Sequence, residues 1–118
     1  MTLHYYGYDK CSTCRKARQW LDEHGVRYQV HDITTDPPSR RVLRQIATSG
    51  DYELKDLFNR SGVLYREMNI KEKVKTASAD ELLDLLAAHG KLIKRPILTD
   101  GKRHTVGFDP IRFKQTWT

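Results

Sequence analysis

The two cysteines of the chain, Cys11 and Cys14, stand three residues apart between a strand-like run and a helix-like run. Residues 3–8 are rich in aromatic residues and extended in character, as expected of a strand. From Arg15 onward apolar residues recur with helical spacing, and Gly25 is placed to end that helix. All the thiol chemistry of the chain is therefore predicted at a loop that leads from a strand into the N-terminus of a helix.

A second strand is expected directly after this helix. The segment Val26–His31 alternates apolar and polar residues, which predicts a half-buried strand. Residues 2–31 are thus predicted to form a strand–helix–strand unit whose first loop carries both cysteines.

The middle of the chain is predicted to be helical. Ser39, after a Pro-Pro pair, is suited to cap a helix, and a short helix is expected after Gly50. Residues 59–75 are predicted to be short helices and loops. The segment Ser78–Glu81 has the pattern of a capping box before a leucine-rich helix, which Gly90 is expected to end.

The C-terminal part has the pattern of a hairpin followed by a helix. The extended runs Pro96–Thr99 and Arg103–Phe108 flank an Asp-Gly pair, which is a strong hairpin signal. Asp109-Pro110 then supplies an N-cap and a first-turn proline for a final helix.

The order of these elements predicts an α/β, thioredoxin-like fold: a βαβ unit and a ββα unit that share a mixed sheet, with a helical insertion between them. Residues 1–118 are expected to form a single domain, as the chain length of 118 residues allows. We expect residues 1–34 and 92–118 to form the thioredoxin-like core and residues 35–91 to form the helical insert.

Composition narrows the class of protein. Apolar residues make up 38% and charged residues 31%, which is typical of a folded globular chain, and no apolar run reaches the length that a membrane helix needs. The N-terminus has no signal-peptide core, so we expect a cytoplasmic protein. Nothing in the sequence requires more than a monomer.

The net charge of +6 allows attraction to anions but does not select a partner. The basic residues are scattered apart from Arg40-Arg41 and Lys71–Lys75, and we interpret Lys71–Lys75 as a solvated basic face. Because the basic and aromatic residues are not interleaved, we expect no direct binding to DNA.

Cys11 is the candidate nucleophile. Its predicted place at a helix N-terminus favours an anion, and a thiolate is such an anion. Lys10 and Arg15 add positive charge nearby. Two alternatives remain open: a pair of inert packed thiols, and a zinc site, for which two further ligands are needed and the five dispersed histidines suggest none.

Three segments in this order resemble the arsenate reductase-like family that includes the Spx/MgsR regulators. They are Tyr8–Ala17, Ile93–Leu98 and Val106–Phe108. The resemblance extends over essentially the whole chain and implies a thioredoxin-like fold with a helical insertion, as the residue patterns also predict.

The resemblance implies a role for the Arg95-Pro96 pair. In this family the proline is expected to be cis, so that Arg95 stands beside Cys11 and stabilises its thiolate or binds an oxyanion. Arg60-Ser61 matches a pair found in the regulators of the family, although Arg60 is equally well explained as a cation at a helix end.

The chain also departs from the glutathione-dependent arsenate reductases. Those enzymes usually have another residue where Cys14 stands, and they use two further arginines besides the one that matches Arg95. One of these falls near Arg60, displaced by one position, and the other falls in Val106–Phe108, which contains no arginine. Arsenate is therefore not the expected substrate.

The candidate site residues follow from the motif and the resemblance together. The catalytic group comprises Cys11, Cys14 and Arg95, with Cys11 and Cys14 as the pair that forms a redox disulfide. The binding group comprises Lys10, Ser12, Thr13, Arg60 and Pro96.

Two functions of different classes are compatible with these residues. The first is a thiol-disulfide oxidoreductase in which Cys11 attacks and Cys14 resolves, with an external thiol reductant such as glutathione or thioredoxin and no bound cofactor. The second is a redox-sensing regulator that resembles Spx and binds the C-terminal domain of the RNA polymerase alpha subunit through the insert around residues 50–60. The regulators generally carry a longer basic C-terminal extension, so the first function is the expectation.

Overall fold

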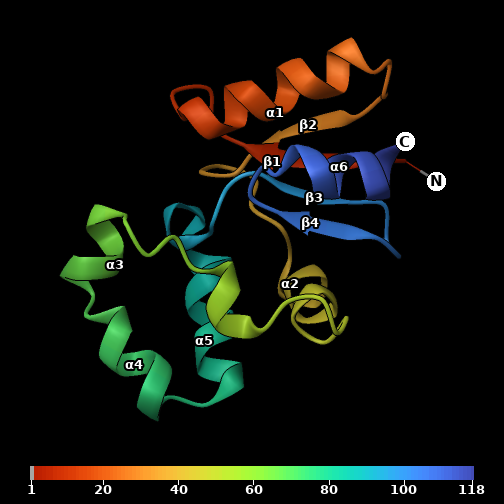
Figure 1. The fold of residues 1–118 in the computed structure, drawn as a ribbon. Helices are drawn as coiled ribbons and strands as arrows, with labels where there is room; N and C mark the ends of the chain where they lie inside the picture. Colours follow the sequence, from red (N-terminus) through yellow and green to blue (C-terminus); the bar gives the residue numbers. More distant parts are fainter. Residues whose placement is uncertain (1) are drawn as a thin grey trace. The chain divides into compact units, whose positions relative to one another are not determined.

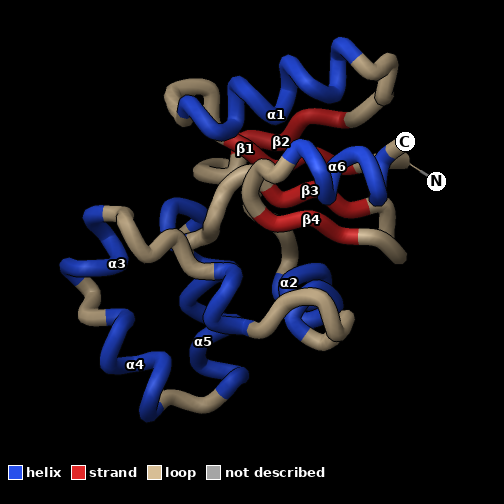
Figure 2. Tube along the Cα trace, viewed as in Figure 1, coloured by secondary structure: helices blue, strands red, loops and turns tan. Residues whose placement is uncertain are grey.

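The computed structural model describes residues 2–118, and its elements are drawn in Figures 1 and 2. The strands are β1 (His4–Gly7), β2 (Gln29–Asp32), β3 (Ile97–Thr99) and β4 (His104–Val106). The α-helices are α1 (Ser12–Glu23), α2 (Arg40–Ala47), α3 (Val63–Glu67), α4 (Ile70–Thr76), α5 (Ala79–Ala88) and α6 (Pro110–Trp117). Two short 3-10 helices complete them: η1 (Leu54–Leu57) and η2 (Gly90–Leu92). Over the described residues, no helix combines the length and the apolar character needed to cross a bilayer.

The strands form one mixed sheet in the order β2-β1-β3-β4. β1 and β2 are parallel, with α1 as the crossover between them, whereas β3 pairs antiparallel with both β1 and β4. A βαβ unit and a ββα unit thus share one sheet, and the predicted α/β, thioredoxin-like fold is confirmed.

Contacts divide the chain into two compact units. The first comprises the chain up to Ile33 together with Arg95–Thr118, and it holds the sheet, α1 and α6. The second comprises Thr34–Lys94 and holds the remaining helices.

The core of the first unit lies on one face of the sheet. Tyr5 of β1 is in register with Leu98 of β3, so both side chains point to the same face. Helices α1 and α6 cover that face, and their buried residues complete one hydrophobic cluster. The cluster consists of Leu3, Tyr5, Cys14, Ala17, Leu21, Leu98, Phe113 and Trp117.

Helix α1 begins at Ser12, three residues earlier than the apolar periodicity predicts. Cys11 is its N-cap, with extended backbone angles and a side chain that accepts a hydrogen bond from the backbone N–H of Cys14. Gly25, with a φ of +68°, follows the helix end as predicted.

The second strand differs from the prediction in position and in exposure. A strand is present in the predicted segment, but β2 begins at Gln29, not at Val26, and Val30 is 47% exposed. The predicted start of the strand and its half-burial are therefore wrong. The physical reason is that β2 is an edge strand paired only with β1, while Val26 and Tyr28, ahead of the strand, pack against the core cluster.

The predicted hairpin is present, with a longer loop. β3 and β4 pair from Ile97 to Val106, and four residues, not an Asp-Gly pair alone, connect them. Oδ1 of Asp100 accepts hydrogen bonds from the backbone N–H groups of Lys102 and Arg103, at 2.9 and 2.7 Å. The aspartate side chain thus provides hydrogen-bond acceptors for two backbone N–H groups of this longer loop.

In the second unit both predicted serine caps are formed. Ser39 accepts from the backbone N–H of Val42 and Ser78 from that of Glu81, each at 3.2 Å. Helix α5 ends at Ala88 with His89 as its C-cap, so Gly90 follows the helix end as predicted, and it also begins η2.

Candidate functional site

Cys11 lies at the point where the β1–α1 loop becomes helix. Its backbone N–H donates to the carbonyl oxygen of Tyr8 at 3.0 Å, and its own carbonyl oxygen accepts from Arg15 at 3.1 Å. The Cys11 Sγ accepts from the backbone N–H of Cys14 at 3.4 Å. The sulfur is half-buried and occupies the position where helix donors favour negative charge, as the motif predicts.

Cys14 lies one turn further along α1 in a different environment. Its side chain is only 1% exposed, within the core cluster of the first unit. Burial, followed by the hydrogen bond to Cys11, raises the pKa of the Cys14 thiol to about 11, against the opposing effect of hydrogen bonds from the Tyr8 backbone and the Tyr5 side chain. Cys14 is therefore a thiol at neutral pH, and the two sulfurs are not bridged.

Tyr5 is a residue of this site that the sequence analysis missed. Its hydroxyl is buried beside Cys14 and donates to the Cys14 carbonyl oxygen at 3.3 Å. Burial, with the nearby Cys14 sulfur as the next cause, raises the pKa of the phenol above its ordinary value.

Gly7 makes this position of the tyrosine ring possible. A Cβ added at Gly7 would lie 2.3 Å from the Tyr5 hydroxyl oxygen, closer than two such atoms can approach. Residues i and i+2 of a strand point to the same face. A tyrosine two residues before a glycine, just ahead of a Cys-x-x-Cys motif, is thus the signal that could have identified Tyr5.

Arg95 is connected to the cysteine loop through Tyr8. The Arg95-Pro96 peptide bond is cis, which confirms the expectation from the family resemblance. The Arg95 guanidinium carbon lies 5.7 Å from the centroid of the Tyr8 ring, within the range of a cation–π contact. The backbone carbonyl oxygen of Tyr8 also accepts a hydrogen bond from the backbone N–H of Cys11. Tyr8 therefore contacts both Arg95 and the loop that carries Cys11. The action of Arg95 on the Cys11 thiolate stays a prediction.

The other predicted residues of the loop are accessible. The side chains of Lys10, Ser12 and Thr13 are exposed around Cys11. Arg15 donates through Nη1 to the carbonyl oxygen of Asp9 at 3.2 Å, which holds its charge against the same loop. Binding by Lys10, Ser12, Thr13 and Pro96 stays a prediction.

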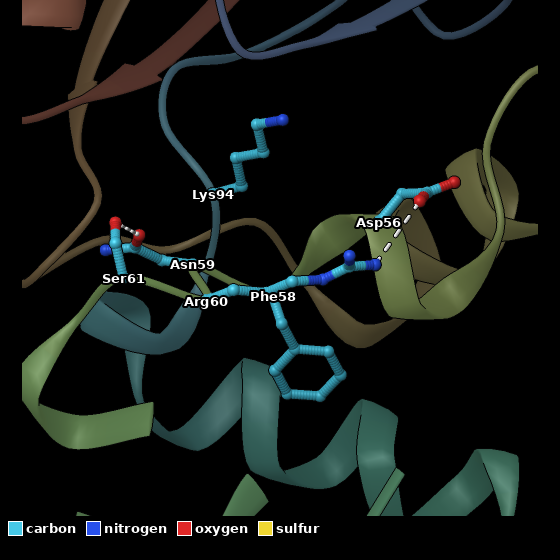
Figure 3. A pocket seen from close by; sticks show the side chains of 6 residues that line it. All are labelled: Asp56, Phe58, Asn59, Arg60, Ser61 and Lys94. Atoms are coloured by element: carbon cyan, nitrogen blue, oxygen red, sulfur yellow. Dashed lines mark hydrogen bonds and ion pairs between the residues drawn. The ribbon is translucent and has the colours of Figure 1, made fainter. Parts of the chain in front are cut away.

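Arg60 lies in the second unit, at a pocket of about 290 Å³ shown in Figure 3. Its Nη2 is 3.7 Å from Oδ1 of Asp56, and Ser61 donates to the side-chain oxygen of Asn59 at 3.2 Å. Lys94 adds a second cation to the wall of this pocket, which the sequence analysis did not anticipate. A role of Arg60 toward Cys11 stays a prediction.

The histidines do not gather with the cysteines. His4 and His31 pair across β1 and β2, with 2.9 Å between Nδ1 and Nε2, and His104 lies 2.8 Å from the hydroxyl oxygen of Thr99. Across residues 2–118 no group of three or more metal-binding side chains comes together. The zinc alternative therefore lacks further ligands in this part of the chain.

Comparisons with known proteins agree with the fold and the motif. The sequence profile of the ArsC family matches residues 6–116. The uncharacterized protein YusI of Bacillus subtilis is 48% identical over 117 residues, which cover 99% of each chain. The global transcriptional regulator Spx of Streptococcus pyogenes serotype M1 is 36% identical over 99 residues, or 84% of this chain and 72% of Spx.

Solved structures show the same relationship. An ArsC family related protein from Bacteroides fragilis superposes with a TM-score of 0.90 at 37% identity and covers 98% of this chain and 97% of its own. Arsenate reductase from Vibrio cholerae superposes with a TM-score of 0.84 at 27% identity, covering 98% of both chains. This chain, with its Cys11–Cys14 pair at the N-terminus of α1, belongs to the ArsC family.

Proposed function

We propose that this protein is a thiol-disulfide oxidoreductase in which Cys11 is the nucleophile and Cys14 the resolving thiol. The observation that carries the proposal is the contact between the Cys14 backbone N–H and the Cys11 Sγ, together with the unequal burial of the two thiols. The accessible sulfur occupies the helix N-cap, where a thiolate is favoured, and the buried sulfur stands one turn behind it.

In the first step the Cys11 thiolate attacks one sulfur of a substrate disulfide. A bond forms between Cys11 Sγ and that sulfur, the substrate S–S bond breaks, and the other substrate sulfur leaves as a thiolate that takes up a proton. The helix donors that stabilise the Cys11 thiolate are the α1 N-terminal backbone groups.

In the second step Cys14 loses its proton and attacks the Cys11 sulfur. The Cys11–Cys14 bond forms, the mixed disulfide breaks, and the second substrate sulfur leaves as a thiolate. The protein is oxidised by two electrons and the substrate disulfide is reduced to two thiols. Two equivalents of glutathione, or one dithiol such as reduced thioredoxin, return the pair to the reduced state.

The raised pKa of Cys14 gives the two thiols their order of reaction. A buried thiol that stays protonated at neutral pH does not compete with Cys11 for the substrate. It becomes the attacking group only when the mixed disulfide lies next to it. We also propose that the positive charge of Arg95 stabilises the Cys11 thiolate, because both residues contact Tyr8. The cycle requires a reducing compartment such as the cytoplasm.

The roles are tested by trapping the mixed disulfide with oxidised glutathione. Cys14→Ser is expected to accumulate one glutathionyl group on Cys11, detected by intact-mass spectrometry, because no resolving thiol remains. Cys11→Ser is expected to remain unmodified over the same time. Equal modification of both variants would overturn the assignment of nucleophile and resolving thiol.

A second candidate is a redox-sensing regulator, and the similarity to Spx over 84% of the chain favours it. The Cys11–Cys14 disulfide would then act as a switch on a binding surface for the RNA polymerase alpha subunit. Binding of the reduced protein to the alpha C-terminal domain in a pull-down assay, lost on oxidation, would support this function over the oxidoreductase.

A further inference from the structure

A second cavity of the Thr34–Lys94 unit is lined by basic side chains. It has a volume of about 460 Å³ and lies among η1, α3 and α4 and the loop that follows η1. Its lining residues are Lys55, Arg60, Tyr65, Lys71, Val74 and Lys75. Four of these six residues carry positive charge, and none carries negative charge. We call this cavity the basic pocket.

The geometry of α4 explains why three of these residues share one wall. Lys71, Val74 and Lys75 are spaced by three and four residues, which places them on one face of a helix. Two like charges one turn apart repel each other and reduce the stability of the helix. The sequence interpretation of Lys71–Lys75 as a solvated basic face omits the cations that other elements bring to this same face.

The carboxylates near the basic pocket do not neutralise it fully. Lys55 pairs with Glu53 at 3.2 Å, Arg60 with Asp56 at 3.7 Å and Lys75 with Glu72 at 3.7 Å. All three pairs are exposed, and exposed pairs contribute little, so these cations can reorient toward a stronger anion. Lys71 has no carboxylate partner among residues 2–118.

The remaining wall is partly apolar. Tyr65 is half-buried, and its ring is fixed edge-on against Phe58 with 6.3 Å between the ring centroids. Val74 adds an aliphatic surface beside the two lysines of α4. A ligand that fits this cavity therefore meets several cations and one aromatic ring.

We propose that the basic pocket binds a small ligand that carries two or more phosphate groups. A single carboxylate can engage only one or two of four cations spread around a cavity of this size, whereas adjacent phosphates can engage several at once. Lysine and arginine bind phosphate through charge-assisted hydrogen bonds, and an arginine can form two such bonds in parallel. The proposal is independent of the thiol chemistry at Cys11.

The test measures binding of pyrophosphate and of ADP to the reduced full chain by isothermal titration calorimetry at physiological ionic strength. Both compounds are expected to bind the wild-type protein, and Lys71→Gln/Lys75→Gln is expected to weaken the binding of each at least tenfold. The matched control is Arg41→Gln/Lys91→Gln, which removes the same charge from exposed positions of the same unit outside the pocket. It is expected to change affinity less than twofold.

The two arms distinguish the source of the phosphates. Tighter binding of ADP than of pyrophosphate, with the difference lost in Tyr65→Leu, identifies a nucleotide ligand. Equal binding identifies a simple phosphate compound. Thermal melts of each variant verify folding. No binding by the wild type, equal losses in both double variants, or binding of long oligonucleotides alone would overturn the proposal.

Discussion

Cys11 and Cys14 are one helical turn apart, yet their environments differ sharply. Cys11 caps α1 and is half-buried, whereas Cys14 is inside the core cluster beside the Tyr5 hydroxyl. Burial is the largest cause of the raised pKa of Cys14, so no additional charged residue is needed to keep this thiol protonated. The motif lies at the start of a helix that packs on the sheet. Its first cysteine is therefore accessible, and its second cysteine, one turn later, is buried.

Tyr5→Phe tests whether the buried hydroxyl assists the resolving step. The Tyr5 hydroxyl beside Cys14 lowers the pKa of the thiol, so its removal should raise that pKa further and reduce the fraction of Cys14 thiolate. We expect intramolecular disulfide formation to slow several-fold at pH 7–8, with its pH profile displaced to higher pH. Alkylation of Cys11 should not change. The measurement is stopped-flow oxidation followed by thiol quantification.

Tyr28→Phe is the matched control for this experiment. It removes a tyrosine hydroxyl that bonds to Asp22 and Arg18 and not to the cysteines. Equal rates of disulfide formation in Tyr5→Phe and the wild type would show that the Tyr5 hydroxyl has only a packing role.

Among the elements, the β3–β4 hairpin depends on one carboxylate. Burial alone would raise the pKa of Asp100, but hydrogen bonds from the backbone of Arg103 and Lys102, then from the Arg103 side chain, lower it below its ordinary value. A carboxyl group whose pKa is lowered by folding stabilises the native state above its unfolded pKa. That contribution is lost as the pH falls through the lowered native value.

Asp100→Asn is therefore expected to destabilise the protein at pH 7 by about 1.5–3 kcal/mol, the range for hydrogen bonds to charged groups. The difference from the wild type should begin to shrink near the ordinary pKa of 3.8, where the unfolded chain takes up the proton first, and should disappear below the lowered native pKa of Asp100. Urea unfolding at several pH values measures both effects. Asp51→Asn, in an exposed loop, is the control, and a constant difference between Asp100→Asn and the wild type from pH 7 to pH 3 would contradict the argument.

The helices and strands also show which local sequence signals are sufficient to predict where an element begins or ends. The caps at Ser39, Ser78 and Asp109 were predictable because a short polar side chain before a helix can bond to its free N–H groups. The bounds of β2 were not, because alternation over residues 26–31 does not reveal which strand ends at an edge of the sheet. The hairpin after Thr99 was predictable, but its second strand begins at His104 and not at Arg103, because the side chain of Asp100 replaces turn hydrogen bonds.

The site shows the same limit of local information. The cysteine pair and Arg95-Pro96 were identified from motifs, whereas Tyr5 was not, since its role depends on the space above Gly7 and on α1 folding back over β1. Lys94 was missed for a similar reason. Lys94 lines the same pocket as Arg60 although more than thirty residues separate them in the sequence, and no local pattern reveals such a long-range contact.

For the whole molecule, the buried thiol predicts a loss of stability in alkaline solution. The pKa of Cys14 is about 11 in the folded protein and 9.0 as its ordinary value. Between these values the unfolded chain releases a proton that the native chain keeps, so the free energy of unfolding falls as the pH rises. The raised pKa of Tyr5 acts in the same direction at higher pH.

We expect the wild-type protein, kept reduced, to lose about 1–3 kcal/mol more stability than Cys14→Ser between pH 9 and pH 11. Denaturant unfolding of both proteins across this range gives the comparison, and Cys11→Ser should follow the wild type more closely than Cys14→Ser does. Parallel curves for wild type and Cys14→Ser would mean that Cys14 is not kept protonated by the fold.

In the proposed function, Cys11 and Cys14 interconvert between a dithiol and an internal disulfide. The most direct measurement is a redox titration against mixtures of reduced and oxidised glutathione, with alkylation and intact-mass spectrometry as the readout. We predict a single two-electron transition of the monomer, near the glutaredoxin range of about −200 to −230 mV, in which both thiols become protected together. Independent modification of the two cysteines, or a disulfide that forms only between chains, would contradict it.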